Sequence, residues 1–118
     1  MEDYDIKLRT KNYAKAIIEL CRRLPDNREG RLIGNQIFRS GTSIASNYRA
    51  ACRARSKADF ISKMGIVEEE TDETLFWLEI LCEMKIIDPN SVQYLIKEGD
   101  EILSIVVASI KTARKNCK

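Results

Sequence analysis

The stretch that decides the fold is LIGNQIFRSGTSIASNYRAACRAR, residues 32–55, which lacks proline and repeats apolar residues at helical spacing. We predict that it forms one helix with about 100° of rotation per residue. Its apolar side carries Ile33, Ile37, Gly41, Ile44, Tyr48 and Cys52. The opposite, partly basic side carries Asn35, Arg39, Thr42, Ser46, Arg49 and Arg53. A polar seam between the two sides consists of Gln36, Ser40, Ser43 and Asn47. The apolar side predicts a buried face, and the basic side is the one hint of function.

The composition indicates a single globular domain over residues 1–118. Hydrophobic residues make up 44% of the 118 residues and charged residues 32%, which is typical of a folded chain. There are five glycines and two prolines, and Pro25 and Pro89 both fall between periodic segments. Long periodic runs with so few interruptions predict helices.

The first predicted helix runs to Leu24, and either Asp5 or Thr10 suits its N-cap. Its inward stripe is Tyr13, Ile17, Leu20, Cys21 and Leu24. Four of its basic residues are interpreted as a solvated face: Lys11, Lys15, Arg22 and Arg23. Residues 25–27 end the helix and Gly30 closes a loop of about six residues, so the first two helices are expected to be antiparallel neighbours.

The third predicted helix spans residues 57–85 and starts at a capping box formed by Ser56 and Asp59. Its inward stripe is Phe60, Met64, Val67, Thr71, Leu75, Leu78 and Cys82. Its acidic band is Glu68, Glu69, Glu70, Asp72 and Glu73. We expect at least one of these carboxylates to pair with Arg39, Ser43 or Asn47 of the preceding helix, and Trp77 to be a core or interface anchor.

A fourth helix is predicted from Asp88, as N-cap, and Pro89, at the first helical position, to about Arg114. Its inward stripe is Val92, Leu95, Ile96, Gly99, Ile102, Leu103, Val106 and Ile110. Four amphipathic helices with short connections predict an all-α, up-down-up-down antiparallel four-helix bundle. Gly34 and Gly41, on or beside the buried side of residues 32–55, indicate either close approach of a neighbouring helix or local softness near a kink.

The residue inventory argues against enzyme chemistry. The chain has no histidine, which excludes a Glu-x-x-His di-iron site and a Ser-His or Cys-His pair. The four cysteines contain no CxxC pair, so a zinc site from Cys21, Cys52 and Cys82 is less favoured than buried thiols. We therefore predict no catalytic residues, no metal, no cofactor and no small-molecule substrate.

Charge and hydropathy limit the partners. The formal net charge is +2, from 20 basic and 18 acidic residues, so recognition must come from local clustering. No apolar run reaches the ~18–20 residues of a spanning helix, and the first residues are acidic where a secretion signal is basic. A cytoplasmic protein without a membrane partner is the expectation.

The basic side of the central stretch has two interpretations. Its cations, extended into the next helix, are Arg39, Arg49, Arg53 and Lys57. They either pair with neighbouring acids or another subunit, or they form a stripe that tracks the phosphates of a nucleic acid. Phe38 and Tyr48 are the only aromatic residues beside them, so contact with the backbone is better supported than base stacking.

The central stretch also resembles a known family, the bacterial four-helix-bundle proteins that include those encoded in 23S rRNA intervening sequences. The motif that carries the resemblance is Gln36-x-x-Arg39-Ser40-Gly41-Thr42-Ser43-Ile44-x-x-Asn47-Tyr48-Arg49-Ala50-Ala51, followed by Arg53-Ala54-Arg55-Ser56-Lys57-x-x-Phe60. Flanking agreement comes from Arg9-Thr10, Leu24-Pro25, Glu68-Glu69-x-x-Asp72-Glu73 and Trp77-Leu78-Glu79. The resemblance covers about residues 5 to 112.

The resemblance implies a ring-like homo-oligomer, commonly a pentamer, and a role in RNA binding. The family is related to the accessory protein of diversity-generating retroelements, which is thought to engage nucleic acid and a reverse transcriptase. Many relatives carry Asn-Ile-Ala-Glu-Gly where this chain has Asn47-Tyr48-Arg49-Ala50-Ala51, so this chain adds a base, Arg49, and lacks the acid and the glycine of that segment. Because the motif is concentrated in the polar seam, we expect this helix to be chiefly an assembly element. A protein-interaction scaffold or accessory subunit without a nucleic-acid role is the alternative.

Overall fold

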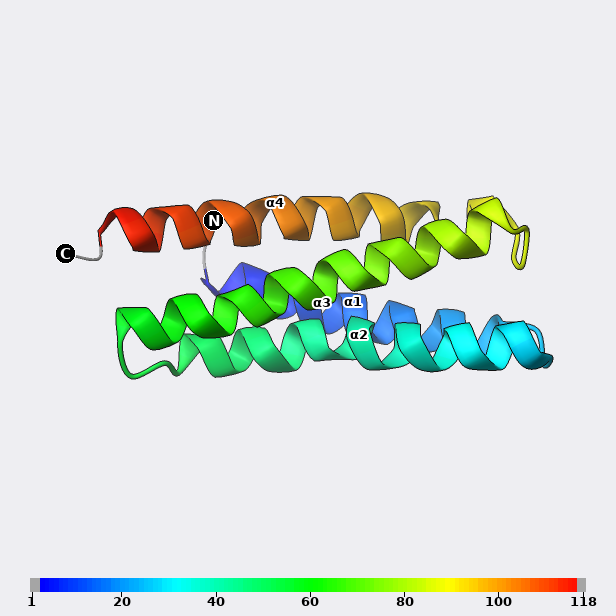
Figure 1. Ribbon diagram of the computed structural model, residues 1–118, viewed down its shortest axis with the longest axis horizontal. Coiled ribbons are helices and arrows are strands. Elements are labelled where there is room, and N and C mark those ends of the chain that lie inside the picture. The colour runs from blue at the N-terminus through cyan, green and yellow to red at the C-terminus, as the bar shows by residue number, and fades with distance from the viewer. Residues whose placement is uncertain (1–2, 117–118) are drawn as a thin grey trace.

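A computed structural model describes residues 3–116, and within that range the chain forms four α-helices and one short 3₁₀ helix (Figure 1). The elements are α1 (Asp3–Arg23), α2 (Arg28–Cys52), α3 (Lys57–Glu83), η1 (Pro89–Ser91) and α4 (Gln93–Lys115). Successive helices run in opposite directions along an elongated body of 50 × 21 × 20 Å. The predicted all-α, up-down-up-down bundle is confirmed.

The ends of α1 and α2 differ from the prediction. α1 begins at Asp3, so neither Asp5 nor Thr10 caps it; Thr10 is buried inside the helix and its hydroxyl donates to the Ile6 carbonyl at 2.9 Å. α2 begins at Arg28 rather than residue 32, because the Asn27 side chain accepts a hydrogen bond of 2.8 Å from the Gly30 N–H.

Gly30 therefore lies in the first turn of α2 and does not close a loop. A Cβ at this position would lie 2.0 Å from the carbonyl oxygen of Pro25, so the connecting segment folds directly onto the helix backbone. α2 ends at Cys52 with Arg53 as its C-cap, so residues 53–55, which were predicted to be helical, lie outside the helix. The connection to α3 uses those residues to turn the chain.

The predicted corner near Ser56 is confirmed. The Ser56 hydroxyl accepts a 3.0 Å hydrogen bond from the Asp59 N–H, while the Asp59 carboxylate accepts one of 3.3 Å from the Arg55 N–H. α3 ends at Glu83, two residues before the predicted end, because Lys85 adopts a left-handed conformation with φ 55°.

The predicted cap at Asp88 belongs to a 3₁₀ turn. The Asp88 carboxylate accepts a hydrogen bond of 3.1 Å from the Asn90 N–H and Pro89 is at the first position, but the turn ends at Ser91. α4 then starts at Gln93 and continues to Lys115, so the predicted helix is divided into η1 and α4.

One hydrophobic core runs along the bundle and contains most of the predicted stripes. Its fully buried large side chains are Tyr13, Ile17, Leu20, Ile37, Ile44, Met64, Val67, Leu78, Leu81, Val92, Ile102 and Val106. Gly41 packs against α1: a Cβ there would lie 2.7 Å from Ile17 Cγ1. Close helix approach, one of the two interpretations of the glycines, therefore applies at Gly41.

Specific contacts join the first and last helices. The Arg9 guanidinium donates to the Glu98 carboxylate at 2.7 and 2.9 Å and to Glu101 at 3.1 Å. Deeper in the bundle, the buried Tyr13 hydroxyl donates to the Leu95 carbonyl at 2.8 Å. Burial raises the pKa of Tyr13, so the phenol stays protonated as a hydrogen-bond donor. Ion pairs at the surface and a tyrosine hydrogen bond in the interior thus join α1 to α4.

The three cysteines within residues 3–116 are free and half-buried against the core. Burial raises the pKa of the Cys21 thiol, consistent with a packing role. Cys117 lies outside the described residues. Among residues 3–116, no group of three histidine, cysteine, aspartate or glutamate side chains could hold a metal ion. None of the helices in this range is both long enough and apolar enough to cross a membrane.

Candidate functional site

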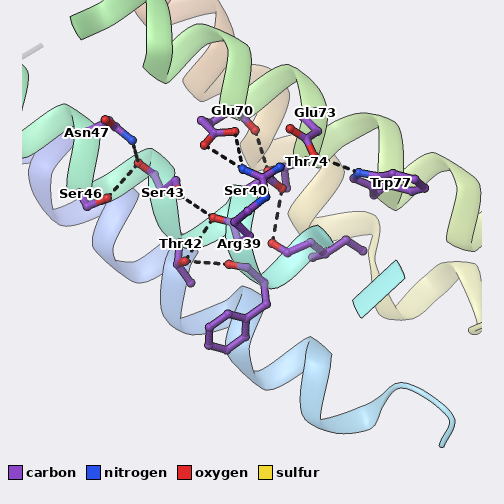
Figure 2. Close-up of polar contacts among 12 residues, drawn as sticks. Arg39, Ser40, Thr42, Ser43, Ser46, Asn47, Glu70, Glu73, Thr74 and Trp77 are labelled. Atoms are coloured by element: carbon purple, nitrogen blue, oxygen red, sulfur yellow. Dashed lines mark hydrogen bonds and ion pairs between the residues drawn. The ribbon is translucent and has the colours of Figure 1, made fainter. Parts of the chain in front are cut away.

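Ser40, a member of the polar seam of α2, makes a buried hydrogen bond to α3. The hydroxyl oxygens of Ser40 and Thr74, both buried, lie 2.9 Å apart and share a hydrogen bond (Figure 2). Thr74 Oγ1 also lies 2.8 Å from the Glu70 carbonyl oxygen of its own helix. A hydroxyl buried without partners would cost free energy, so this pair favours one register of α2 against α3.

Arg39 extends the contact between α2 and α3 to the surface. Its guanidinium bonds two carboxylates of α3, Glu70 at 3.2 Å and Glu73 at 2.5 Å (Figure 2). The Trp77 indole N–H donates to the same Glu73 carboxylate at 3.3 Å. The Arg39 hydrogen bond is the main reason that the pKa of Glu73 lies below its usual value, and the Glu73 bond raises the pKa of Arg39. The predicted pairing of Arg39 with the acidic band is confirmed.

The other seam residues bond within α2. Ser43 Oγ donates to the Arg39 carbonyl at 2.6 Å and Asn47 Nδ2 donates to the Ser43 carbonyl at 2.9 Å, so neither of them takes a carboxylate of α3 (Figure 2). Gln36 is exposed. Of the four seam residues, Ser40 thus makes a side-chain hydrogen bond to another helix.

The opposite flank of α2 forms a groove with α1. The groove has a volume of about 710 Å³ and is lined by Lys7, Leu8, Lys11, Thr42, Ala45, Ser46, Arg49, Ala50 and Arg53. The two helices lie side by side and antiparallel (Figure 1), and Ile17 lies level with Gly41. Lys7 and Lys11, nearer the start of α1, are therefore level with the last turns of α2.

Four of the nine lining residues are cations and none is an acid. All four are exposed. Within residues 3–116, their side chains have no ion pair or hydrogen bond. Like charges that line one groove repel each other. The groove is therefore a site of uncompensated positive charge suited to an anion.

The structure separates the four cations that the sequence placed on one stripe. Arg49 and Arg53 share the groove, whereas Arg39 lies on the α3 flank. Lys57 lies outside the groove, and its ammonium donates to the Asn116 carbonyl at 2.9 Å after the end of α4. Two phosphate-binding candidates of the stripe thus remain together, and two do not.

Lys7 and Lys11 were missed as site residues by sequence reasoning, which assigned Lys11 to a solvated face. The spacing of the basic residues along the sequence could have identified these two lysines. Lys7 and Lys11 are four residues apart and so project from one side of α1, as Arg49 and Arg53 do at the end of α2. Pairing the two helices antiparallel brings both pairs to one end of the hairpin.

Comparisons with known proteins agree with the motif. The family model described as 23S rRNA-intervening sequence protein matches residues 2–108. A crystal structure of a protein of unknown function from the S23 ribosomal protein family of Bacteroides thetaiotaomicron is 34% identical. It superposes with a TM-score of 0.87, covering 94% of this chain and 99% of that one. No protein with a curated description matches this chain.

Proposed function

Since this chain belongs to the 23S rRNA-intervening sequence protein family, we propose that it is a non-enzymatic, cytoplasmic protein that binds the RNA backbone through the groove between α1 and α2. The observation that carries the proposal is the cluster of Lys7, Lys11, Arg49 and Arg53, which has no carboxylate beside it. Phosphate oxygens are the acceptors that such a cluster would neutralise.

The lining favours contact with phosphates over reading of bases. No aromatic side chain lines the groove, so bases have no platform on which to stack. The Thr42 hydroxyl donates to the Phe38 carbonyl at 2.7 Å and the Ser46 hydroxyl to the Ser43 carbonyl at 3.2 Å. Their protons are committed to the helix, which leaves the four cations as the donors. Binding should therefore depend on charge and salt, with little sequence preference.

The test is fluorescence anisotropy of a labelled single-stranded RNA at several salt concentrations. For the wild type, log K should fall with log salt by about 0.7 per neutralised phosphate. Replacing Arg49→Glu and Arg53→Glu together should weaken binding and flatten this slope.

A matched control is Lys111→Glu with Lys115→Glu, because these lysines are also exposed, four residues apart and near a helix C-terminus. Both double variants should keep the helical circular dichroism of the wild type. Equal loss of RNA binding in the two double variants would mean that the groove contributes only through the net charge of the protein. Unchanged binding in the Arg49 and Arg53 variant would exclude the groove.

We also propose that the protein forms a homo-oligomer, with a pentamer as the number that the family resemblance suggests. Exposed apolar side chains support a subunit contact at the end of the bundle that holds the α1–α2 connection and η1. They are Leu32, Phe38, Phe76, Met84 and Tyr94. Native mass spectrometry of protein purified without nuclease should report five subunits and any retained RNA together. A monomer at micromolar concentration would contradict the assembly.

A protein-interaction scaffold without a nucleic-acid role is the second candidate function. It is favoured by the same exposed apolar residues, which suit a protein partner as well as a second copy of the chain. Under this alternative, Arg39 serves only to join α2 and α3. The variant with Arg49→Glu and Arg53→Glu should then retain as much RNA as the wild type. The anisotropy experiment separates the two candidates.

A further inference from the structure

The groove cations outnumber the internal phosphates that an RNA strand would place beside them. Lys7 and Lys11 are separated by one helical turn, about 6 Å along the axis, and so are Arg49 and Arg53. The four charges thus form two facing pairs over about one turn. A nucleic-acid strand advances about 3.4 Å per phosphate in a duplex, so only about two internal phosphates fall within this length.

Terminal phosphoryl groups match the cluster better. An internal phosphodiester carries one negative charge, whereas a phosphate monoester carries about −1.5 to −2 at neutral pH. A 5′-triphosphate places three phosphoryl groups in succession at one end of a chain. Such an end brings more negative charge to the length of the cluster than a continuing backbone does.

The shape of the lining agrees with a terminal group. Ala45 and Ala50 are short, so the cationic side chains can converge above them. Leu8 lines the same groove and is 43% exposed, which offers apolar contact to a ribose or a base beyond the phosphates. The volume of about 710 Å³ is in the range of pockets that hold a nucleotide-sized group.

From charge density and shape we infer that the groove formed by Lys7, Lys11, Arg49 and Arg53 recognises the phosphorylated 5′ end of an RNA in preference to its internal backbone. This inference rests on the proposed function, because it specifies which part of the RNA occupies the same groove. Recognition involves no covalent step, only charge-assisted hydrogen bonds from the four cations.

The test compares one RNA oligonucleotide in three forms, with a 5′-triphosphate, a 5′-monophosphate or a 5′-hydroxyl, each labelled at its 3′ end. Anisotropy should give a Kd about tenfold lower for the triphosphate than for the hydroxyl form, with the monophosphate between them. Replacing Lys7→Gln and Lys11→Gln together should remove the preference, while Lys111→Gln with Lys115→Gln should keep it.

The possible failures are distinguishable. If all three RNAs bind equally and Arg49→Glu with Arg53→Glu abolishes binding, terminal recognition is overturned and the proposed function stands. If GTP alone competes as strongly as the triphosphate RNA and the hydroxyl RNA does not bind, the ligand is a free nucleotide, which overturns both. If no RNA binds, both also fall.

Discussion

Arg39 and Arg49 belong to one helix and are both exposed, yet their surroundings are opposite. On one flank of α2, α3 presents Glu70 and Glu73 to Arg39. On the other flank, α1 presents Lys7 and Lys11 to the groove that contains Arg49. Arginine is thus paired with carboxylates on the α3 flank and grouped with other cations on the α1 flank.

The difference shows that the neighbouring helix decides what an exposed arginine does. A neutralised arginine joins two helices, and its charge is no longer available to a ligand. An arginine among lysines contributes repulsion to the folded chain, which an anion would relieve. The α3 flank accordingly joins two helices, and the α1 flank is the side to which our proposal assigns binding.

The largest expected effect concerns the packing of α1 against its side of α2. Gly41→Ala should destabilise the protein by about 1–3 kcal/mol, because its Cβ would meet the branched Ile17 side chain and outweigh the gain in helix propensity. Urea unfolding measures the change.

The matched control for this glycine is Gly65→Ala in α3, where an added Cβ meets nothing within 4 Å. It should stabilise the protein by about 0.5–1 kcal/mol. Similar changes for the two variants would mean that α1 does not approach α2 as closely as described.

On the α3 flank, Thr74→Val should cost about 1 kcal/mol, since it keeps the shape and removes the buried hydroxyl that bonds Ser40. Thr42→Val is the control, because the Thr42 hydroxyl bonds only its own helix and is half-exposed. Chemical denaturation should show the larger loss for Thr74. If Ser40→Ala and Thr74→Val were fully additive, the hydroxyl pair would not couple the two helices.

The two arginines can be compared directly when each is replaced by glutamine in a separate variant. Arg39→Gln should lower the melting temperature and leave the salt slope of RNA binding unchanged. Arg49→Gln should leave the melting temperature nearly unchanged and reduce that slope by about 0.7. A common pattern for both variants would remove the distinction between the flanks.

The smallest effect is a pH dependence at Glu73. Its pKa lies below the ordinary value of 4.5 in the folded protein, so the unfolded chain takes up a proton first as the pH falls. The ion pair with Arg39 therefore stabilises the fold above about pH 4.5 and is lost as the pH drops through the folded pKa. Thermal melts of wild type and Glu73→Gln should differ at neutral pH and converge in acid.

Much of the fold was predictable from local signals. Ile37, Ile44 and Tyr48 repeat at helical spacing, and all three are buried. Ser56 caps α3 as its position before Asp59 indicates. The start of α2 was not predictable from periodicity, because Asn27 and the fold of the connection onto Gly30 decide it. The start of α4 was missed because a 3₁₀ turn uses the same capping residues.

The candidate site was only half predictable. Arg49 and Arg53 were identified on a helical projection, but such a projection describes one helix alone. It gives no information on whether Glu70 or Lys11 occupies the neighbouring surface at the same level. The acidic band of the third predicted helix indicated a partner for Arg39, but nothing local indicated the contact of Lys57 with the Asn116 carbonyl.

By itself, the sequence determined the number of helices, their inward faces and their antiparallel order, because periodicity, breakers and short connections are local properties of the chain. Tertiary structure decided which charges meet. Electrostatic interactions depend on distances between residues far apart in sequence, such as Arg39 and Glu73 or Lys7 and Arg53. Those distances exist only after the helices have packed in one register, so the division of α2 into a neutralised and a cationic flank follows from the fold.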